Sequence, residues 1–168
     1  MEDLRKIDEG AHLDESIEWW YFNGLFDAGS PLSGWSLVTV CTLSRGLMED
    51  AQFVLFPPGK PPIELSWHEL PAGSIKTGTK GVDVEFGKNF LRGNYPRWQS
   101  HFEQTVDNKS YHVDLNYEAD LDSQFRVYRS GNSYLNHFVV LRSRIRGEVE
   151  LEGKIYPITG VGYYEHMY

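Results

Sequence analysis

Hydrophobic and polar residues alternate with a period of two along most of this chain, which is the pattern of half-buried β-strands. The clearest case is the segment 111–121, where apolar or aromatic side chains occupy every second position and polar ones lie between them. No segment has the apolar period of a helix, and only short stretches such as 44–50 are compatible with a helical turn. The pattern therefore predicts an all-β protein.

Clusters of turn-forming residues divide the rest of the chain into further short strands. We expect these at 19–26, 35–43, 52–56, 64–68, 82–86, 89–93, 98–106 and 137–145, with a last hairpin formed by 149–151 and 155–158. About eight to ten antiparallel strands in one domain must protect their edges, either by closing into a barrel or by stacking as a sandwich. Periodicity alone does not distinguish a barrel from a sandwich. A barrel of about eight strands has room for one small ligand.

The net charge of the chain argues against some classes of binding partner. Its 168 residues suit one domain, and the net charge of −8 argues against nucleic acid and anionic membrane surfaces as partners. Arg142, Arg144 and Arg146 alternate along one expected strand, as on a solvated face. No apolar run reaches the length of a membrane span, and the polar N-terminus lacks the features of a signal or transit peptide. We therefore expect a soluble, cytoplasmic protein.

Other residues with reactive side chains give weaker signals. The single cysteine, Cys41, lies in an apolar strand pattern, so we expect a buried, inert thiol. None of the six histidines shows HxH or HExxH spacing, and no phosphate-binding loop or GxSxG motif is present. The sequence therefore predicts no metal site and no cofactor.

The segment 18–26, EWWYFNGLF, places four consecutive aromatic residues after a carboxylate. Alternation directs Glu18 and Trp20 to one face, and Trp19, Tyr21 and Asn23 to the other. Because both faces are aromatic, we expect both to be covered. An inward Glu18 against the Trp20 ring would keep its proton to higher pH. The alternative is that Glu18 caps a strand end in solvent.

The segment 160–168, GVGYYEHMY, ends the chain with a second set of polar and aromatic residues. Alternation places Tyr163 with Glu165 on one face, and Tyr164 with His166 on the other. A phenol beside a carboxyl is suited to proton donation to a bound substrate, although mixed packing of a terminal strand is the plainer alternative. We expect the first and last strands to direct acid groups into an apolar interior. The expected ligand-binding residues are Glu18, Trp19, Trp20, Tyr21, Asn23, Tyr164 and His166.

These two segments resemble the signatures of the AttH-like and carotenoid 1,2-hydratase superfamily. HLDESIEWWYFNG at 12–24 is similar to its opening motif, and GVGYYEH at 160–166 is similar to the end of its first domain. The resemblance implies a lipocalin-like β-barrel over residues 1–168, as a single domain or as the N-terminal half of a two-barrel protein. Members of the superfamily hydrate isoprenoid double bonds, cyclise tocopherol precursors or catalyse cycloadditions of polyenes.

The resemblance also implies catalytic residues. In the hydratases an Asp of this closing motif is the proposed proton donor, and Glu165 holds that position with one extra methylene group. Tyr163 matches the Tyr two positions before it, and His137 matches an upstream His. Val139, however, stands where the hydratases have a Trp, which is a departure from a strict carotenoid hydratase. The resemblance thus implies Glu165, Tyr163 and His137 as catalytic residues.

Three functions are compatible with this sequence. The first is an acid-assisted hydratase or cyclase acting on an apolar polyene, in which aromatic rings stabilise a carbocation. The second is a non-catalytic module that binds a lipid or isoprenoid in a mostly apolar pocket. The third is a structural half of a larger protein, whose partner is a second barrel domain or a second copy of the chain.

Overall fold

The computed structural model describes residues 8–44 and 48–168. These residues form one antiparallel sheet of 13 strands, and none of them lies in an α-helix. The expected all-β, lipocalin-like class is confirmed, with more strands than the sequence pattern predicts. Within the described ranges, no helix is long and apolar enough to cross a membrane.

Most of the strands lie where alternation places them. In chain order they are β1 (Ile17–Phe26), β2 (Ser36–Ser44), β3 (Met48–Phe56), β4 (Ile63–Glu64), β5 (Trp67–Leu70), β6 (Lys76–Thr77), β7 (Val82–Phe86), β8 (Asn89–Asn94), β9 (Arg97–Val106), β10 (Lys109–Ala119), β11 (Gln124–Ser130), β12 (Ser133–Leu151) and β13 (Lys154–Met167). The strand expected at 64–68 is divided between β4 and β5. The helical turn considered at 44–50 is wrong at 48–50, which begin β3, while 45–47 lie outside the described residues.

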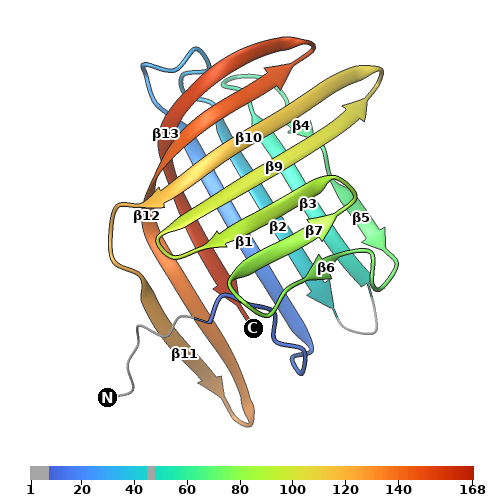
Figure 1. Cartoon of the computed structure of the whole chain (residues 1–168), viewed down its shortest axis with the longest axis vertical. Coiled ribbons are helices and arrows are strands. Elements are labelled where there is room, and N and C mark those ends of the chain that lie inside the picture. The colour runs from blue at the N-terminus through green and yellow to red at the C-terminus, as the bar shows by residue number, and fades with distance from the viewer. Residues whose placement is uncertain (1–7, 45–47) are drawn as a thin grey trace.

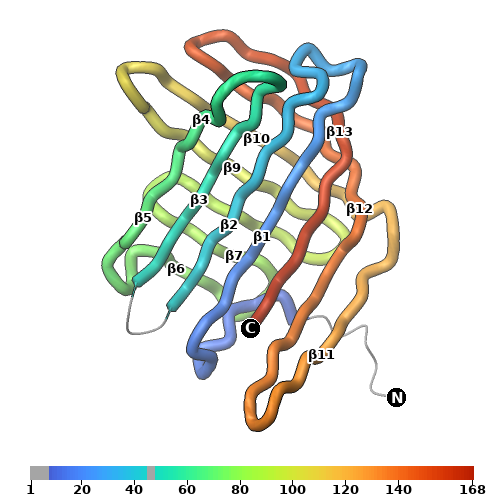
Figure 2. Tube along the Cα trace, turned by 180° about the vertical axis from the view of Figure 1, so that it is seen from behind, coloured from blue at the N-terminus to red at the C-terminus, as the bar shows by residue number. Residues whose placement is uncertain are grey.

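The sheet rolls over on itself, so that two layers of strands face each other (Figures 1 and 2). Its hydrogen-bonded order is β4-β3-β2-β1-β13-β12-β10-β9-β8-β7-β6, with β11 added to β12 and β5 added to β3. The strands β1, β2 and β3 lie in one layer, and β7 to β10 cross in front of them (Figure 1). The long strands β12 and β13 belong to both layers. A register shift between Val140 and Ser143 on β12 allows the bend, as bulges do in curved sheets.

Large side chains fill the space between the two layers. The Tyr164 ring stacks on Phe22 with centroids 4.4 Å apart, and it contacts Trp98 at 4.7 Å and Phe138 at 5.7 Å. All four rings are at most 2% exposed. Cys41 is also fully buried, as expected, and burial raises the pKa of its thiol. Apolar burial of this kind is the main stabilising contribution to such a fold.

The segment before β1 closes one end of the rolled sheet. The backbone N–H of Ala11 donates to the carbonyl of Gly78 at 2.9 Å, just after β6. The buried carboxylate of Glu9 accepts hydrogen bonds from the backbone N–H of Tyr95 and from the Trp98 indole, both at 2.7 Å. The N-terminal segment therefore ties β1 to the β6 and β8–β9 region of the opposite layer.

Candidate functional site

The paired strands β1 and β13 carry both motifs, and alternation divides their side chains between two faces. Trp20 is opposite His166 in the register, and Tyr21 is opposite Glu165. Trp20 and His166 are buried in the interior, so Tyr21 and Glu165 lie on the outer face. This corrects the expectation that Glu165 and Glu18 enter one hollow. Residues that share a face were grouped correctly from the sequence, but the two groups lie on opposite sides of the sheet.

Glu165 is the centre of a polar cluster on the outer face. The Trp19 indole donates to its Oε1 at 3.2 Å, and the Tyr163 hydroxyl donates to its Oε2. His137 Nε2 lies 3.3 Å from the same Oε2. We call these four residues, Trp19, His137, Tyr163 and Glu165, the Glu165 cluster. The structure thus brings together the three residues implied as catalytic, with His137 on β12 beside Tyr163 and Glu165 on β13.

Burial within the cluster is partial, which leaves its polar atoms close to a surface. The side chains of His137 and Glu165 are 14% and 19% exposed. Neither ring nitrogen of His137 has a hydrogen bond of ordinary geometry to a described residue. Burial, followed by the hydrogen bond to Glu165, raises the pKa of Tyr163, so its phenol keeps its proton near neutral pH. Tyr163 therefore acts as a hydrogen-bond donor to the carboxyl group.

The strands beside β13 complete the surroundings of Glu165. In the register Tyr21 on β1 and Val139 on β12 lie directly opposite it. The Tyr21 ring meets the Tyr163 ring edge-on at 5.9 Å, and the Asn23 amide donates to the Tyr21 hydroxyl at 3.3 Å. Val139, at the position of the hydratase Trp, is 3% exposed and adds an apolar contact surface.

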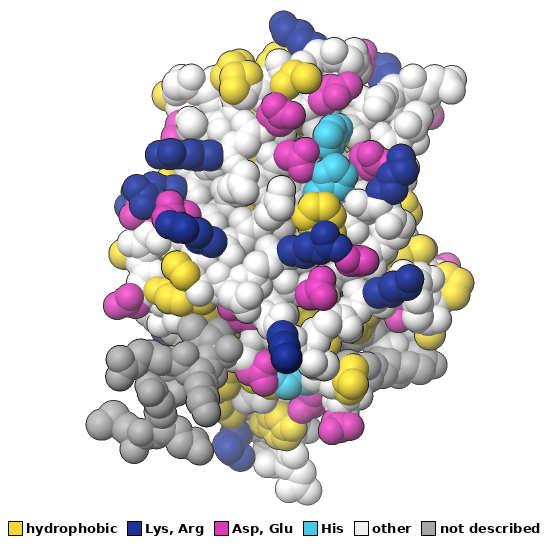
Figure 3. All heavy atoms as spheres, viewed as in Figure 1, with side chains coloured by type: hydrophobic (Ala, Val, Ile, Leu, Met, Phe, Trp, Pro, Cys, Tyr) yellow, Lys and Arg dark blue, Asp and Glu magenta, His cyan; other side chains and the backbone are white. Residues whose placement is uncertain are grey.

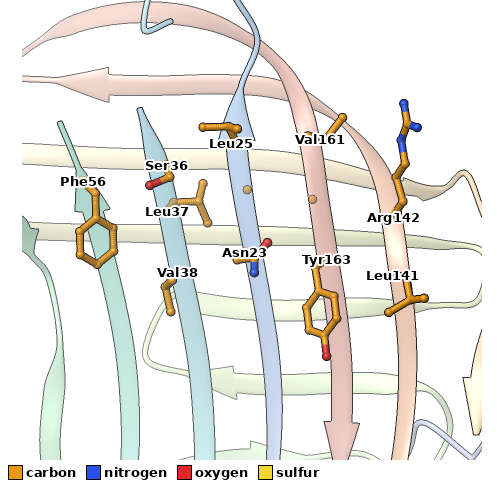
Figure 4. Close-up of a pocket in the computed structure, with 12 residues that line it drawn as sticks. Asn23, Leu25, Ser36, Leu37, Val38, Phe56, Leu141, Arg142, Val161 and Tyr163 are labelled. Carbon is orange, nitrogen blue, oxygen red and sulfur yellow. The ribbon is translucent and has the colours of Figure 1, made fainter. Parts of the chain in front are cut away.

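An open apolar trough of about 850 Å³ lies next to the cluster on the outer face (Figure 4). Leu25, Phe56 and Leu141 line it and are 40–51% exposed. Tyr163 lies along β13 at the edge of the trough and belongs to both features, and Arg142 is the cationic residue of the lining. An exposed apolar surface with few polar groups is typical of a site that a ligand or another protein surface covers.

A different polar group lies on the inner face, around Glu18. Its carboxylate is fully buried and accepts from the backbone N–H of His12 at 3.0 Å. Its Oε1 is also 2.9 Å from His12 Nδ1 and 2.9 Å from His166 Nε2. Burial alone would raise the pKa of Glu18, but the two imidazoles outweigh it and lower the pKa to about 2. The expectation that an inward Glu18 retains its proton is therefore wrong, because histidines rather than Trp20 alone surround it.

The remaining expected ligand-binding residues on this face are part of the packed interior. The Trp20 ring stacks on His166 at 4.8 Å, and both are at most 1% exposed. Tyr164 is fully buried, and burial raises its pKa well above the ordinary value. Burial also disfavours the charged form of His166 and therefore lowers its pKa. Trp20, Tyr164 and His166 thus support the fold around Glu18, whereas Trp19, Tyr21 and Asn23 belong to the outer site.

The burial of Glu9 was not expected from the sequence. Glu9 is 3% exposed, and burial raises its pKa to about 7 in spite of the hydrogen bonds from Tyr95 and Trp98. It occurs in an acidic N-terminal stretch, which gives no sign that one carboxylate turns inward. The interior therefore holds an acid with a raised pKa at Glu9 and one with a lowered pKa at Glu18.

Comparison with known proteins gives a fold. No protein-family profile and no curated protein matches the sequence. Among solved structures, a candidate AttH protein from Nitrosomonas europaea matches 94% of the chain, with a TM-score of 0.70 and 18% sequence identity. The fold is AttH-like. Kievitone hydratase from Nectria haematococca matches 90% of the chain, with a TM-score of 0.64 and 12% identity.

The AttH-like fold covers only part of each matched structure. This chain spans 52% of the Nitrosomonas protein and 47% of the kievitone hydratase, about half the length in each case. At these identities the likeness concerns the fold.

Proposed function

We propose that this protein is an acid–base catalyst of the hydratase class, which protonates a carbon–carbon double bond of an apolar substrate lying in the outer trough. The observation that carries the proposal is the position of Glu165. Its carboxyl group joins a phenol, an imidazole and an indole, directly beside an apolar trough. Such a combination of one acid with neighbouring donors and an apolar binding surface suits proton transfer to an alkene.

The reaction begins with the acid form of Glu165. Its proton is transferred to one alkene carbon, and the other carbon becomes a carbocation. The electron-rich faces of Trp19 and Tyr21 stabilise this cation. Water then forms the new carbon–oxygen bond, and its surplus proton returns to the Glu165 carboxylate, directly or through His137. The Trp19 and Tyr163 hydrogen bonds stabilise the carboxylate in the interval between the two transfers.

The comparisons support this class of reaction and a larger complete site. One matched structure is named as a hydratase, and the superfamily that the motifs resemble includes enzymes that hydrate isoprenoid double bonds. Both matched chains are about twice as long as this one. We therefore propose that a second β-domain or a second copy of the chain covers the trough and excludes bulk water. Exclusion of water is needed because a carbocation is otherwise captured without control.

The test is turnover of a panel of prenylated phenols and linear polyenes, with products identified by mass in ordinary and heavy-oxygen water. We expect a product heavier by one water molecule, with the oxygen taken from the solvent. Glu165→Gln, which removes the acid but keeps the shape, should lower the rate by about 10²–10⁴-fold, the usual contribution of a general acid. Glu165→Asp, which restores the hydratase residue, should keep measurable activity. Equal rates for wild type and Glu165→Gln would remove Glu165 from the mechanism.

The open, apolar character of the trough favours a second candidate, a binding module without chemistry. Trp19 lies beside Tyr163 at the edge of the trough, so a bound polyene should quench tryptophan fluorescence. A binder would release the ligand unchanged, and Glu165→Ala would alter its affinity only a few-fold. An exchange of alkene-adjacent hydrogen with solvent, dependent on Glu165, would instead favour the catalyst.

A further inference from the structure

A second cluster of histidine and carboxylate side chains lies on the opposite layer, on the outer face of the β9–β10 hairpin. A two-residue turn at Asp107 and Asn108, with φ of 51° and 61°, joins the strands in the manner of tight hairpins. This turn fixes the register so that His101 on β9 is directly opposite Asp114 on β10. His112 is two residues before Asp114 and therefore shares its face.

The three side chains converge on one point. His101 Nδ1 is 2.8 Å from Asp114 Oδ1, and His112 Nε2 is 2.9 Å from Asp114 Oδ2. The ligand atoms of all three residues lie within 4.8 Å of one another. His112 Nε2 is buried, yet among the described residues it has no hydrogen bond of ordinary geometry. His112 Nε2 therefore points at the Asp114 carboxylate without forming a well-aligned hydrogen bond.

The surroundings favour a cation and hold the imidazoles in place. Glu103 is opposite His112 on β9, and the Oε2 of Glu150 on β12 is 4.0 Å from His112 Nδ1. Phe90 stacks on the His101 ring at 5.1 Å and limits its rotation. Figure 3 shows histidine side chains among acidic ones on this face of the molecule. The net charge of −8 adds a general attraction for cations.

We propose that His101, His112 and Asp114 bind one divalent transition-metal ion, with Zn²⁺ as the ion that suits two imidazoles and one carboxylate. Such a donor set is typical of zinc and unlike the all-oxygen sets of Mg²⁺ or Ca²⁺. A tetrahedral zinc site places its ligand atoms about 3.3 Å apart, so the two imidazole–carboxylate contacts of 2.8 Å and 2.9 Å must widen to admit the ion. A water molecule takes the fourth position.

Two other histidine groups show why this cluster is the better site. His68 lies near Asp50 and Glu64 but offers a single imidazole, and its side chain is 52% exposed, as in an ordinary surface ion pair. The inner group of His12, Glu18 and His166 has a similar composition. There the Glu18 carboxylate already accepts hydrogen bonds, from the His12 backbone among others, so a metal would have to displace well-formed bonds. At the β9–β10 hairpin a metal would displace the single hydrogen bond between His101 Nδ1 and Asp114 Oδ1, whereas His112 Nε2 has no well-formed bond to lose.

The sequence pattern concealed this site. His101 and His112 lie eleven residues apart, on different strands, so no HxH or HExxH spacing records them. The hairpin turn alone brings them together. A metal at this position would link β9 to β10 and is independent of the reaction proposed for Glu165, which lies on the outer face of the other layer.

The experiment is a zinc titration of the full chain carrying no histidine tag, with a chromophoric chelator as competitor. We expect one equivalent of Zn²⁺ to bind, and the His101→Gln/His112→Gln double variant to lose this binding. Asp114→Asn alone should weaken it by about tenfold or more, because one of three protein ligands is lost. His68→Gln is the matched control and should bind as wild type does. Zn²⁺ should also raise the melting temperature of the wild type but not of the double variant.

Each other outcome would overturn the proposal. Undiminished binding by the double variant, together with its loss in His12→Gln, would assign the ion to the inner group. Absence of saturable binding by the folded wild type would show that the cluster is a hydrogen-bonded surface network only. Circular dichroism of each variant confirms that it is folded, so a failure to bind can be attributed to the missing ligand.

Discussion

Glu18 and Glu165 lie on adjacent strands of the same sheet but on its opposite faces. Glu18 is fully buried between His12 and His166, whereas Glu165 lies outside, bonded to Trp19 and Tyr163. The first carboxylate is therefore a structural ion within the interior, and the second is available to a substrate. This separation means that their substitutions should have different consequences, the first for stability and the second for the proposed reaction.

Glu18→Gln should destabilise the protein by about 3 kcal/mol near neutral pH, because it removes one partner of a buried, hydrogen-bonded charge group. The pKa of Glu18 is about 2 in the folded protein against an ordinary 4.5, so the unfolded chain binds its proton at higher pH. Stability from this group is therefore complete above about pH 4.5 and is lost as the pH falls toward about 2. The wild type should lose about 3 kcal/mol in this way, and Glu18→Gln should lose none of it.

Urea unfolding followed by tryptophan fluorescence, repeated from acidic to neutral pH, measures both effects. Glu64→Gln is the control, because that carboxylate is 61% exposed and should leave stability and its acid dependence unchanged. A wild-type acid dependence that persists undiminished in Glu18→Gln would show that other carboxylates cause it.

Glu9 should impose the opposite pH dependence. Its pKa is raised to about 7 from an ordinary 4.5, so the folded protein holds this proton more tightly than the unfolded chain does. Stability from this group is present at low pH and decreases as the pH rises from about 4.5 to about 7. Glu9→Gln should remove about 2–3 kcal/mol of that decrease, so the variant gains stability relative to wild type as the pH rises. A difference between the two proteins that stays constant with pH would contradict this.

The adjacent residues Trp19 and Trp20 should respond very differently to truncation. Trp20 is 1% exposed and stacks on His166, so Trp20→Ala should cost about 3–5 kcal/mol in the free energy of unfolding. Trp19 is half-buried on the outer face, and Trp19→Ala should cost about 1–2 kcal/mol, from its partial burial and its hydrogen bond to Glu165. Chemical denaturation of the two variants makes this comparison. Similar losses would mean that the two faces are covered to the same degree.

Alternation allowed the local structure to be predicted, but the arrangement around the site depends on long-range contacts. The period of two correctly paired Tyr163 with Glu165 and Trp20 with Glu18. It could not say which face turns inward, because EWWYFNGLF is aromatic on both sides. The pairing of β1 with β13, which brings Trp19 to Glu165, joins the first strand of the chain to the last. No local signal records such a contact, and the implied role of Glu165 came from a motif instead.

The missed features have the same origin. The strand β11 extends the sheet by pairing with the first half of β12, and most of its residues are exposed, so it lacks a buried stripe. Glu9 is buried by Tyr95 and Trp98, which lie far along the chain. Burial of a charged residue by distant partners leaves no trace in the local pattern, whereas burial of an apolar strand does.

Two glycines, one from the opening motif and one from the closing motif, offer a prediction about the packing beneath the site. Gly24 on β1 and Gly162 on β13 are directly opposite each other, and the Ile145 side chain packs against both on the inner face. A Cβ at Gly24 would lie 2.6 Å from Ile145 Cδ1, and its next neighbour, Leu37, is at an ordinary 3.6 Å. A Cβ at Gly162 would meet the Asn23 backbone oxygen at 2.6 Å as well as Ile145. Removal of Cδ1 therefore relieves the first clash but only part of the second.

We accordingly expect Gly24→Ala to cost about 1–3 kcal/mol and Ile145→Val to cost about 1 kcal/mol. In the double variant Gly24→Ala/Ile145→Val the total should be clearly less than the sum, because the shorter side chain leaves room for the new methyl group. Gly162→Ala with Ile145→Val should remain severely destabilised, since a backbone oxygen cannot withdraw as a side chain does. The two double-mutant cycles are measured by denaturant unfolding, and full additivity in the Gly24 cycle would contradict the packing described for Ile145.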